Sequence, residues 1–89
     1  MISPVEFRRH LHRHPELSFE EHQTAQYIAH ALTEAGIAWR PIAQTGILAR
    51  IEGRGELSHA VVLRADIDAL PIGEQADTAW RSQNEGVMH

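Results

Sequence analysis

The sequence predicts an α/β fold in which two helices are followed by about three strands. Two segments near the start of the chain open with helix-capping patterns and carry apolar residues at helical spacing, and this spacing ends after Gly36. Residues 60–63 then form an uninterrupted apolar run, which is typical of a strand buried on both faces of a mostly parallel sheet. Such a strand needs neighbours on both edges, so we expect a mixed, mostly parallel sheet that is incomplete within these 89 residues.

The first predicted helix has a well-defined start and end. Ser3 is the expected N-cap, Pro4 occupies the first helical position, and Glu6 completes a capping box. Pro15 ends the helix, because it disfavours the helical conformation of the residue before it.

The second predicted helix starts with Ser18 as N-cap and Glu21 at the third helical position, and Gly36 ends it. Glu20 and Glu21 could supply a catalytic carboxylate, but capping and the helix dipole already account for acidic residues in a first turn. The apolar residues at helical spacing form one face, which we expect to be core: Ala25, Ile28, Ala29, Leu32 and Ala35.

Strands are predicted over residues 37–42 and 47–52, with a turn at Thr45 and Gly46 between them. Pro41 places the first of these strands at a sheet edge, because proline cannot donate to the ladder. The run at residues 60–63 is the third predicted strand, and no clear pattern follows Ile72. We expect Trp39 and Trp80 to be packing residues.

The candidate site lies at the end of the third predicted strand. Arg64, Asp66 and Asp68 alternate there and would project from one side, at the end of a strand where ligands bind in α/β sheets. Two carboxylates in this place are compatible with a metal or acid–base site. The alternative is a structural turn in which Asp66 pairs with Arg64 and Asp68 caps the loop, and the short pattern alone favours that turn.

A second candidate is the histidine series His10, His12 and His14. Histidines 10 and 14 would share one helix face and could chelate a divalent ion, as in a small histidine-rich metal-binding protein. Because Pro15 moves His14 off the helix, hydrogen bonding at the helix end is the favoured interpretation.

Composition excludes several classes of protein. The formal net charge is −4 and acidic residues surround the few clustered arginines, so we expect no nucleic-acid partner. The absence of cysteine excludes a disulfide framework and thiolate metal ligands within these residues. No apolar run approaches the length of a membrane span and the first residues do not form a signal peptide, so we expect no membrane partner and a cytoplasmic location.

Three motifs in order carry a family resemblance: LHRHPELSFEE at residues 11–21, LRADIDALPI at 63–72 and SQNEGVMH at 82–89. Together they resemble the N-terminal part of the metal-dependent amidohydrolases of the aminoacylase and carboxypeptidase (zinc metallopeptidase) superfamily. The most similar branch is that of hippurate hydrolase, N-acyl-amino-acid amidohydrolase and the auxin-conjugate hydrolases.

The resemblance implies a zinc-exopeptidase-like catalytic domain that holds two divalent metal ions, zinc or manganese, and hydrolyses the amide bond of N-acyl amino acids or small peptides. Residues 1–89 would be the N-terminal portion of that domain. The smaller dimerisation or lid domain would be absent from this chain, and the full-length protein would be a candidate homodimer.

The resemblance also implies roles for three residues. Asp68 matches the aspartate that orients a metal-binding histidine through a hydrogen bond, and Asp66 stands where other branches carry that histidine. His89 would border the metal pocket. The metal ligands themselves are expected beyond His89, so we expect the chain alone to be inactive and to hold no metal tightly. The alternative is a non-catalytic truncated remnant or binding module whose incomplete sheet leaves an exposed, self-associating edge.

Overall fold

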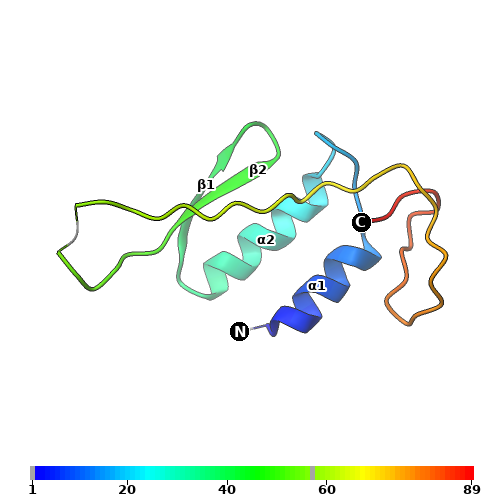
Figure 1. Ribbon diagram of the computed structural model, residues 1–89, viewed down its shortest axis with the longest axis horizontal. Coiled ribbons are helices and arrows are strands. Elements are labelled where there is room, and N and C mark those ends of the chain that lie inside the picture. Colours follow the sequence, from blue (N-terminus) through cyan, green and yellow to red (C-terminus); the bar gives the residue numbers. More distant parts are fainter. Residues whose placement is uncertain (1, 57) are drawn as a thin grey trace.

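The structure is a computed structural model that describes residues 2–56 and 58–89. Two helices precede a two-stranded antiparallel sheet, which confirms the predicted α/β organisation (Figure 1). The elements are α1 (Pro4–Arg13), α2 (His22–Glu34), β1 (Ala38–Ile42) and β2 (Gly46–Arg50). Among the described residues, no helix is long and apolar enough to cross a bilayer.

Helix α1 begins and ends as predicted. The Glu6 amide donates to the Ser3 hydroxyl over 3.1 Å, and the Ser3 amide donates back to the Glu6 carboxylate over 3.4 Å. This reciprocal capping box satisfies two amides that the first turn leaves without partners. The helix ends at Arg13, and the following Pro15 is fully buried.

Helix α2 begins at His22, so the predicted Ser18–Glu21 capping box is wrong. Phe19 has φ 63°, a left-handed conformation that turns the chain and prevents a helix from starting at Ser18. Glu16 caps the helix from outside instead: its carboxylate accepts from the Thr24 amide and hydroxyl, both over 2.6 Å, and from the Gln23 amide over 3.2 Å.

Glu21 therefore has a different role from the predicted cap. Its side chain is buried and accepts a 3.0 Å hydrogen bond from the Thr45 hydroxyl, which is buried as well. This contact fastens the turn between β1 and β2 to the start of α2. At the other end of α2, Gly36 has φ 72°, and the predicted glycine stop is confirmed.

Strands β1 and β2 confirm the first two predicted strands and the turn between them. They pair antiparallel with Ala38 opposite Arg50 and Pro41 opposite Ile47. The indole of Trp39 donates a 2.9 Å hydrogen bond to the Thr33 hydroxyl, which ties the hairpin to the end of α2. The guanidinium of Arg9 lies 3.8 Å from the centre of the Trp80 ring, so Trp80 is a packing residue as predicted. Trp39, by contrast, is 40% exposed.

The third predicted strand is not formed in the described part of the chain. Residues 60–66 run as a long extended trace without strand pairing (Figure 1). Val61, Val62 and Leu63 are 83%, 81% and 92% exposed. The expectation of burial is wrong here because a doubly buried strand depends on neighbouring strands and on helices over both faces, and no described residue takes those places.

The small core lies instead where the extended segment ends. Ala69 is only 3% exposed, and Pro15 is the largest fully buried residue. Isolated bridges join Leu17 to Ala69 in parallel and Leu70 to Met88 in antiparallel. Segments far apart in the sequence therefore meet around Ala69.

Candidate functional site

The three sequence motifs converge at this small core. The Ala69 amide donates to the Glu16 carbonyl over 2.8 Å, which joins the second motif to the first. Leu70 and Met88 exchange two backbone hydrogen bonds of 2.8 and 3.0 Å, which join the second motif to the third. The end of the extended segment is thus held between two strand-like neighbours.

The third motif is also fastened directly to the end of α1. The Gln83 amide donates to the Arg13 carbonyl over 2.8 Å, and the Asn84 side chain donates to the Pro15 carbonyl over 3.1 Å. Within the motif, the Ser82 hydroxyl donates to the Val87 carbonyl over 2.7 Å and closes a compact turn. All three motifs therefore form one hydrogen-bonded unit.

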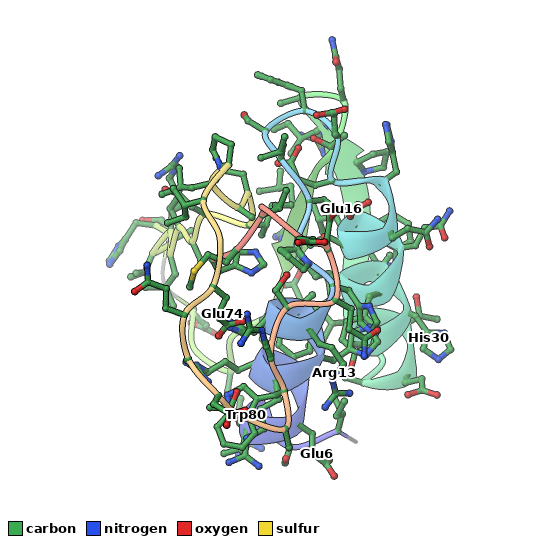
Figure 2. The ribbon with its side chains drawn as sticks, turned by 90° about the vertical axis from the view of Figure 1, so that its right-hand side faces the viewer. Glu6, Arg13, Glu16, His30, Glu74 and Trp80 are labelled. Atoms are coloured by element: carbon green, nitrogen blue, oxygen red, sulfur yellow. The ribbon has the colours of Figure 1, made fainter. Side chains whose placement is uncertain are left out.

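Glu74 supports this unit from the loop between the second and third motifs. Its side chain is 5% exposed; one oxygen accepts from the Ser82 amide over 2.6 Å and the other lies 2.8 Å from Nε2 of His12, which is itself 13% exposed. Figure 2 shows Glu74 beside α1 and His30 on the outer side of α2. The Ser82 and His12 hydrogen bonds stabilise the carboxylate and lower the pKa of Glu74, although burial opposes them.

Sequence patterns do not indicate the role of Glu74. The residue lies in the polar stretch after Ile72, where no periodicity marks a buried position. The sequence predicts that His12 forms a hydrogen bond at the helix end, whereas its actual partner is 62 residues away. A single carboxylate in such a loop looks the same in sequence whether it is solvated or buried.

Asp66 pairs with Arg64, as in the structural turn that the sequence analysis gives as the alternative to a metal or acid–base site. Its carboxylate pairs with Arg64 over 2.7 Å, and both side chains are well exposed. Asp68 is half-buried at the end of the extended segment, next to Ala69. The ring of His89 reaches the same place, because its Nε2 lies 3.2 Å from the Ile67 carbonyl oxygen.

His89 also lies near His12, with 6.3 Å between the two ring centres. The structure therefore brings His89, the end of the extended segment and the His12–Glu74 pair to one region. It leaves Asp66 on the exposed part of the segment, in contact with Arg64.

The residues present do not by themselves make a metal centre. In residues 2–56 and 58–89, no group of three or more histidine, cysteine, aspartate or glutamate side chains is arranged to hold a metal ion. His10 stacks on Tyr27 with 3.7 Å between ring centres, and its ring centre lies 4.7 Å from that of His14, whereas His12 faces Glu74. The histidine series thus divides between two sides of α1.

An open cleft of about 650 Å³ lies between α1 and α2. His10, His14, Tyr27 and His30 line it, together with Asn84 from the third motif. Burial, followed by the nearby charges of His14 and Arg13, lowers the pKa of His10. Asp66, Asp68 and His89 do not line this cleft, although residues of the first and third motifs do.

The chain is similar to known hydrolases in sequence. It is 46% identical over 92 aligned residues to an uncharacterized hydrolase of Staphylococcus haemolyticus, covering 99% of this chain and 24% of the relative. It is 50% identical over 82 residues to an uncharacterized hydrolase of Staphylococcus aureus, covering 92% of this chain and 21% of the relative. No family model matches the chain.

The fold is similar to that of a solved metallopeptidase. The Bacillus subtilis YXEP protein, a dinuclear metal binding peptidase from the M20 family, matches with a TM-score of 0.88 and 44% identity, covering 96% of this chain and 24% of that one. The chain thus spans about a quarter of the length of the proteins it matches. The predicted resemblance to metal-dependent hydrolases is confirmed.

Proposed function

Because the chain resembles a dinuclear metal-binding peptidase of the M20 family in sequence and fold, we propose that it forms the N-terminal portion of the catalytic domain of a metal-dependent hydrolase. The reaction is hydrolysis of the amide bond of an N-acyl amino acid or small peptide. Zinc or manganese is the proposed metal, and it would polarise the carbonyl and supply the attacking hydroxide.

The convergence of the three motifs is the observation that carries the proposal. The motifs that carry the family resemblance are separated in sequence, yet backbone hydrogen bonds join them. These bonds involve Glu16, Ala69, Leu70 and Met88. A site on rigid, mutually bonded segments is more accurately placed than one on free loops. The chain therefore contributes a framework on one side of the proposed active site.

Within that framework, the residues of this chain orient metal-binding side chains and line the metal pocket. They do not form a complete metal site by themselves. We propose that Asp68 orients a metal-binding histidine through a hydrogen bond. We also propose that His89 lies at the border of the metal pocket. Asp66 matches the position of a ligand histidine in other branches, but its pairing with Arg64 supports a structural role. Because the described residues form no three-ligand group, the 89-residue chain alone is proposed to be inactive.

A chimera tests the proposal directly. Residues 1–89 would replace the matching quarter of the Bacillus subtilis YXEP protein, and hydrolysis of N-acyl amino acids and dipeptides would be followed with added zinc or manganese. We expect metal-dependent turnover by the chimera and none by the isolated chain. A folded chimera without turnover, beside an active parent protein, would contradict the proposal.

An Asp68→Asn chimera tests the assigned positioning role. We expect it to fold and to lose both metal affinity and turnover, by about tenfold or more. A Glu85→Gln chimera is the matched control, because Glu85 is exposed in the third motif. Equal metal content and turnover in both variants would show that Asp68 has no positioning role in the proposed site.

A further inference from the structure

A buried contact between His12 and Glu74 joins the first motif to the loop that follows the second. The two side chains are 13% and 5% exposed, and 2.8 Å separates Nε2 of the imidazole from the carboxylate. Because residues of this chain already bury both groups, the contact does not depend on residues outside the chain. Burial removes a carboxylate from water, and this cost offsets much of what the contact gains, so stability alone is a weak reason for the pair.

The loop between the second and third motifs lies along one face of α1, and Figure 2 shows Glu74 and Trp80 beside that helix. Arg9 and His12 are three positions apart on α1 and therefore share this face. The guanidinium of Arg9 covers the ring of Trp80, and His12 faces Glu74. Arg81 closes the loop on itself, because its guanidinium donates to the Glu74 carbonyl over 2.9 Å.

The carboxylate of Glu74 also connects His12 to the end of the third motif. One oxygen faces His12, and because a carboxylate only accepts, Nε2 of His12 is the donor. The other oxygen accepts from the Ser82 amide over 2.6 Å, and the Ser82 hydroxyl donates to the Val87 carbonyl over 2.7 Å. Val87 lies two residues before His89. A displacement of the imidazole would therefore be transmitted through two side chains to this end of the chain.

We propose that His12 and Glu74 are positioning residues that fix the third motif against α1, and with it the metal ligands that the proposed function places beyond His89. The inference rests on that proposed function, since it assigns the pair a part in the same site. The pair acts through Ser82 and Val87 and need not touch metal or substrate. Because small displacements of reacting groups affect turnover strongly, we expect loss of the pair to lower kcat and metal affinity more than it changes KM.

Amide hydrogen exchange in the 89-residue chain tests the positioning without any need for activity. Met88 and Ala69 both donate to backbone carbonyls of another motif, but only Met88 belongs to the third motif. In His12→Leu, which removes the imidazole donor, we expect the Met88 amide to exchange about tenfold faster and the Ala69 amide to change by less than about twofold. Equal acceleration at both amides would indicate general destabilisation and would overturn the proposal.

Two further variants control for the loss of a histidine. His12→Gln keeps a side-chain NH₂ that can donate to Glu74, so exchange at Met88 should return to within about threefold of its rate in the unmodified chain. His30→Leu removes a histidine that is 71% exposed on α2, and it should leave the exchange at Met88 unchanged. If His12→Gln is folded by circular dichroism but exchanges as fast as His12→Leu, the hydrogen bond does not position the motif.

The chimera with the Bacillus subtilis YXEP protein tests the consequence for catalysis. His12→Leu and Glu74→Gln should each lower kcat and metal affinity about tenfold, with KM changed by less than about twofold, and His12→Gln should recover most of the loss. The double variant of His12→Leu and Glu74→Gln should be no worse than the single ones, because each already removes the same contact. Additive losses in kcat, or a change confined to KM, would contradict the proposal.

The two measurements separate failure of the positioning role from failure of the proposed function. Turnover by the unsubstituted chimera that His12→Leu leaves unchanged would overturn the positioning role and leave the hydrolase assignment in place. An unsubstituted chimera that is folded and inactive, together with selective acceleration at Met88 in the chain, would overturn the hydrolase assignment and still support the positioning of the third motif by His12 and Glu74.

Discussion

The imidazole of His12 and the carboxylate of Glu74 lie 2.8 Å apart although 62 residues separate them in the sequence. Glu74 also accepts from the Ser82 amide, and Ser82 closes the turn of the third motif. One carboxylate thereby links α1 to the segment that ends at His89. The loop around Glu74 is held by this contact and not by regular secondary structure.

Replacing Glu74 by glutamine should lower the melting temperature of the protein. Glu74 makes two side-chain contacts, with the Ser82 amide and with His12. The glutamine oxygen can accept only one of these hydrogen bonds, because an NH₂ group replaces the second carboxylate oxygen. The substitution also removes the negative charge opposite His12. Thermal unfolding followed by circular dichroism measures the change. Glu85→Gln is the control, because Glu85 is exposed. Identical melting of both variants would show that the Glu74 contacts add nothing.

Replacing Glu16 by alanine should destabilise α2. The three hydrogen bonds that Glu16 accepts from Thr24 and Gln23 satisfy the helix start, and loss of a cap costs about 1 kcal/mol in the free energy of unfolding. Urea unfolding gives this quantity. Glu20→Ala is the matched control, because Glu20 is exposed and lies in the same turn before the helix. A larger loss from Glu20 than from Glu16 would contradict the assigned cap.

Acid should destabilise the protein through Glu16 and Glu74. Burial acts to raise the pKa of Glu16, but hydrogen bonds from Thr24 and Gln23 and the charge of His22 outweigh it, so the pKa lies below the ordinary 4.5. The pKa of Glu74 is also below 4.5. Both groups bind protons more readily when unfolded, so their stabilisation is complete above about pH 4.5 and is lost as pH falls through the lowered values.

Denaturant unfolding at several pH values measures this acid dependence. The slope of stability against pH below 4.5 should be smaller in Glu74→Gln than in the unmodified chain, because one of the two linked groups is gone. His10 acts in the same direction at higher pH: its folded pKa is below 6.5, so protonation disfavours the folded state. An unchanged slope in Glu74→Gln would contradict the assignment to Glu74.

Enlarging Ala69 should disturb the junction of the three motifs. Ala69 is 3% exposed, so the extra atoms of leucine would force neighbouring backbones apart, at a cost of about 1–3 kcal/mol. Ala76→Leu is the control, since Ala76 is exposed. Stability measured by urea unfolding should fall only in the Ala69 variant. Equal stability of both variants would mean that the junction is not tightly packed.

Local rules predict the first half of the fold well. The caps of α1, the proline and glycine stops, and the hairpin around Thr45 depend on residues within a few positions of each other, and the structure confirms them. The predicted start of α2 is wrong because the left-handed Phe19 and the distant cap from Glu16 both override the local Ser18 signal. Capping by a residue outside the helix leaves no fixed spacing in the sequence.

The second half depends on contacts that sequence patterns do not encode. The apolar run at residues 60–63 correctly indicates an extended segment, but its burial depends on partner strands, and those are not among the described residues. The motifs suggest a site region only through their resemblance to metal-dependent hydrolases, whereas the His12–Glu74 contact joins two residues with no pattern in common. Such contacts become visible only when the chain is folded.

The central claim is that the three motifs form one hydrogen-bonded unit. Amide hydrogen exchange at the junction of the motifs tests this claim most directly. In dilute protein, we predict slow exchange for the amides of Ala69, Leu70, Gln83 and Met88, each of which donates to a backbone carbonyl of a distant segment. The amides of residues 61–64 should exchange rapidly under the same conditions. Equally rapid exchange at all of these positions would show that the motifs do not meet in solution and would contradict the framework proposed for the active site.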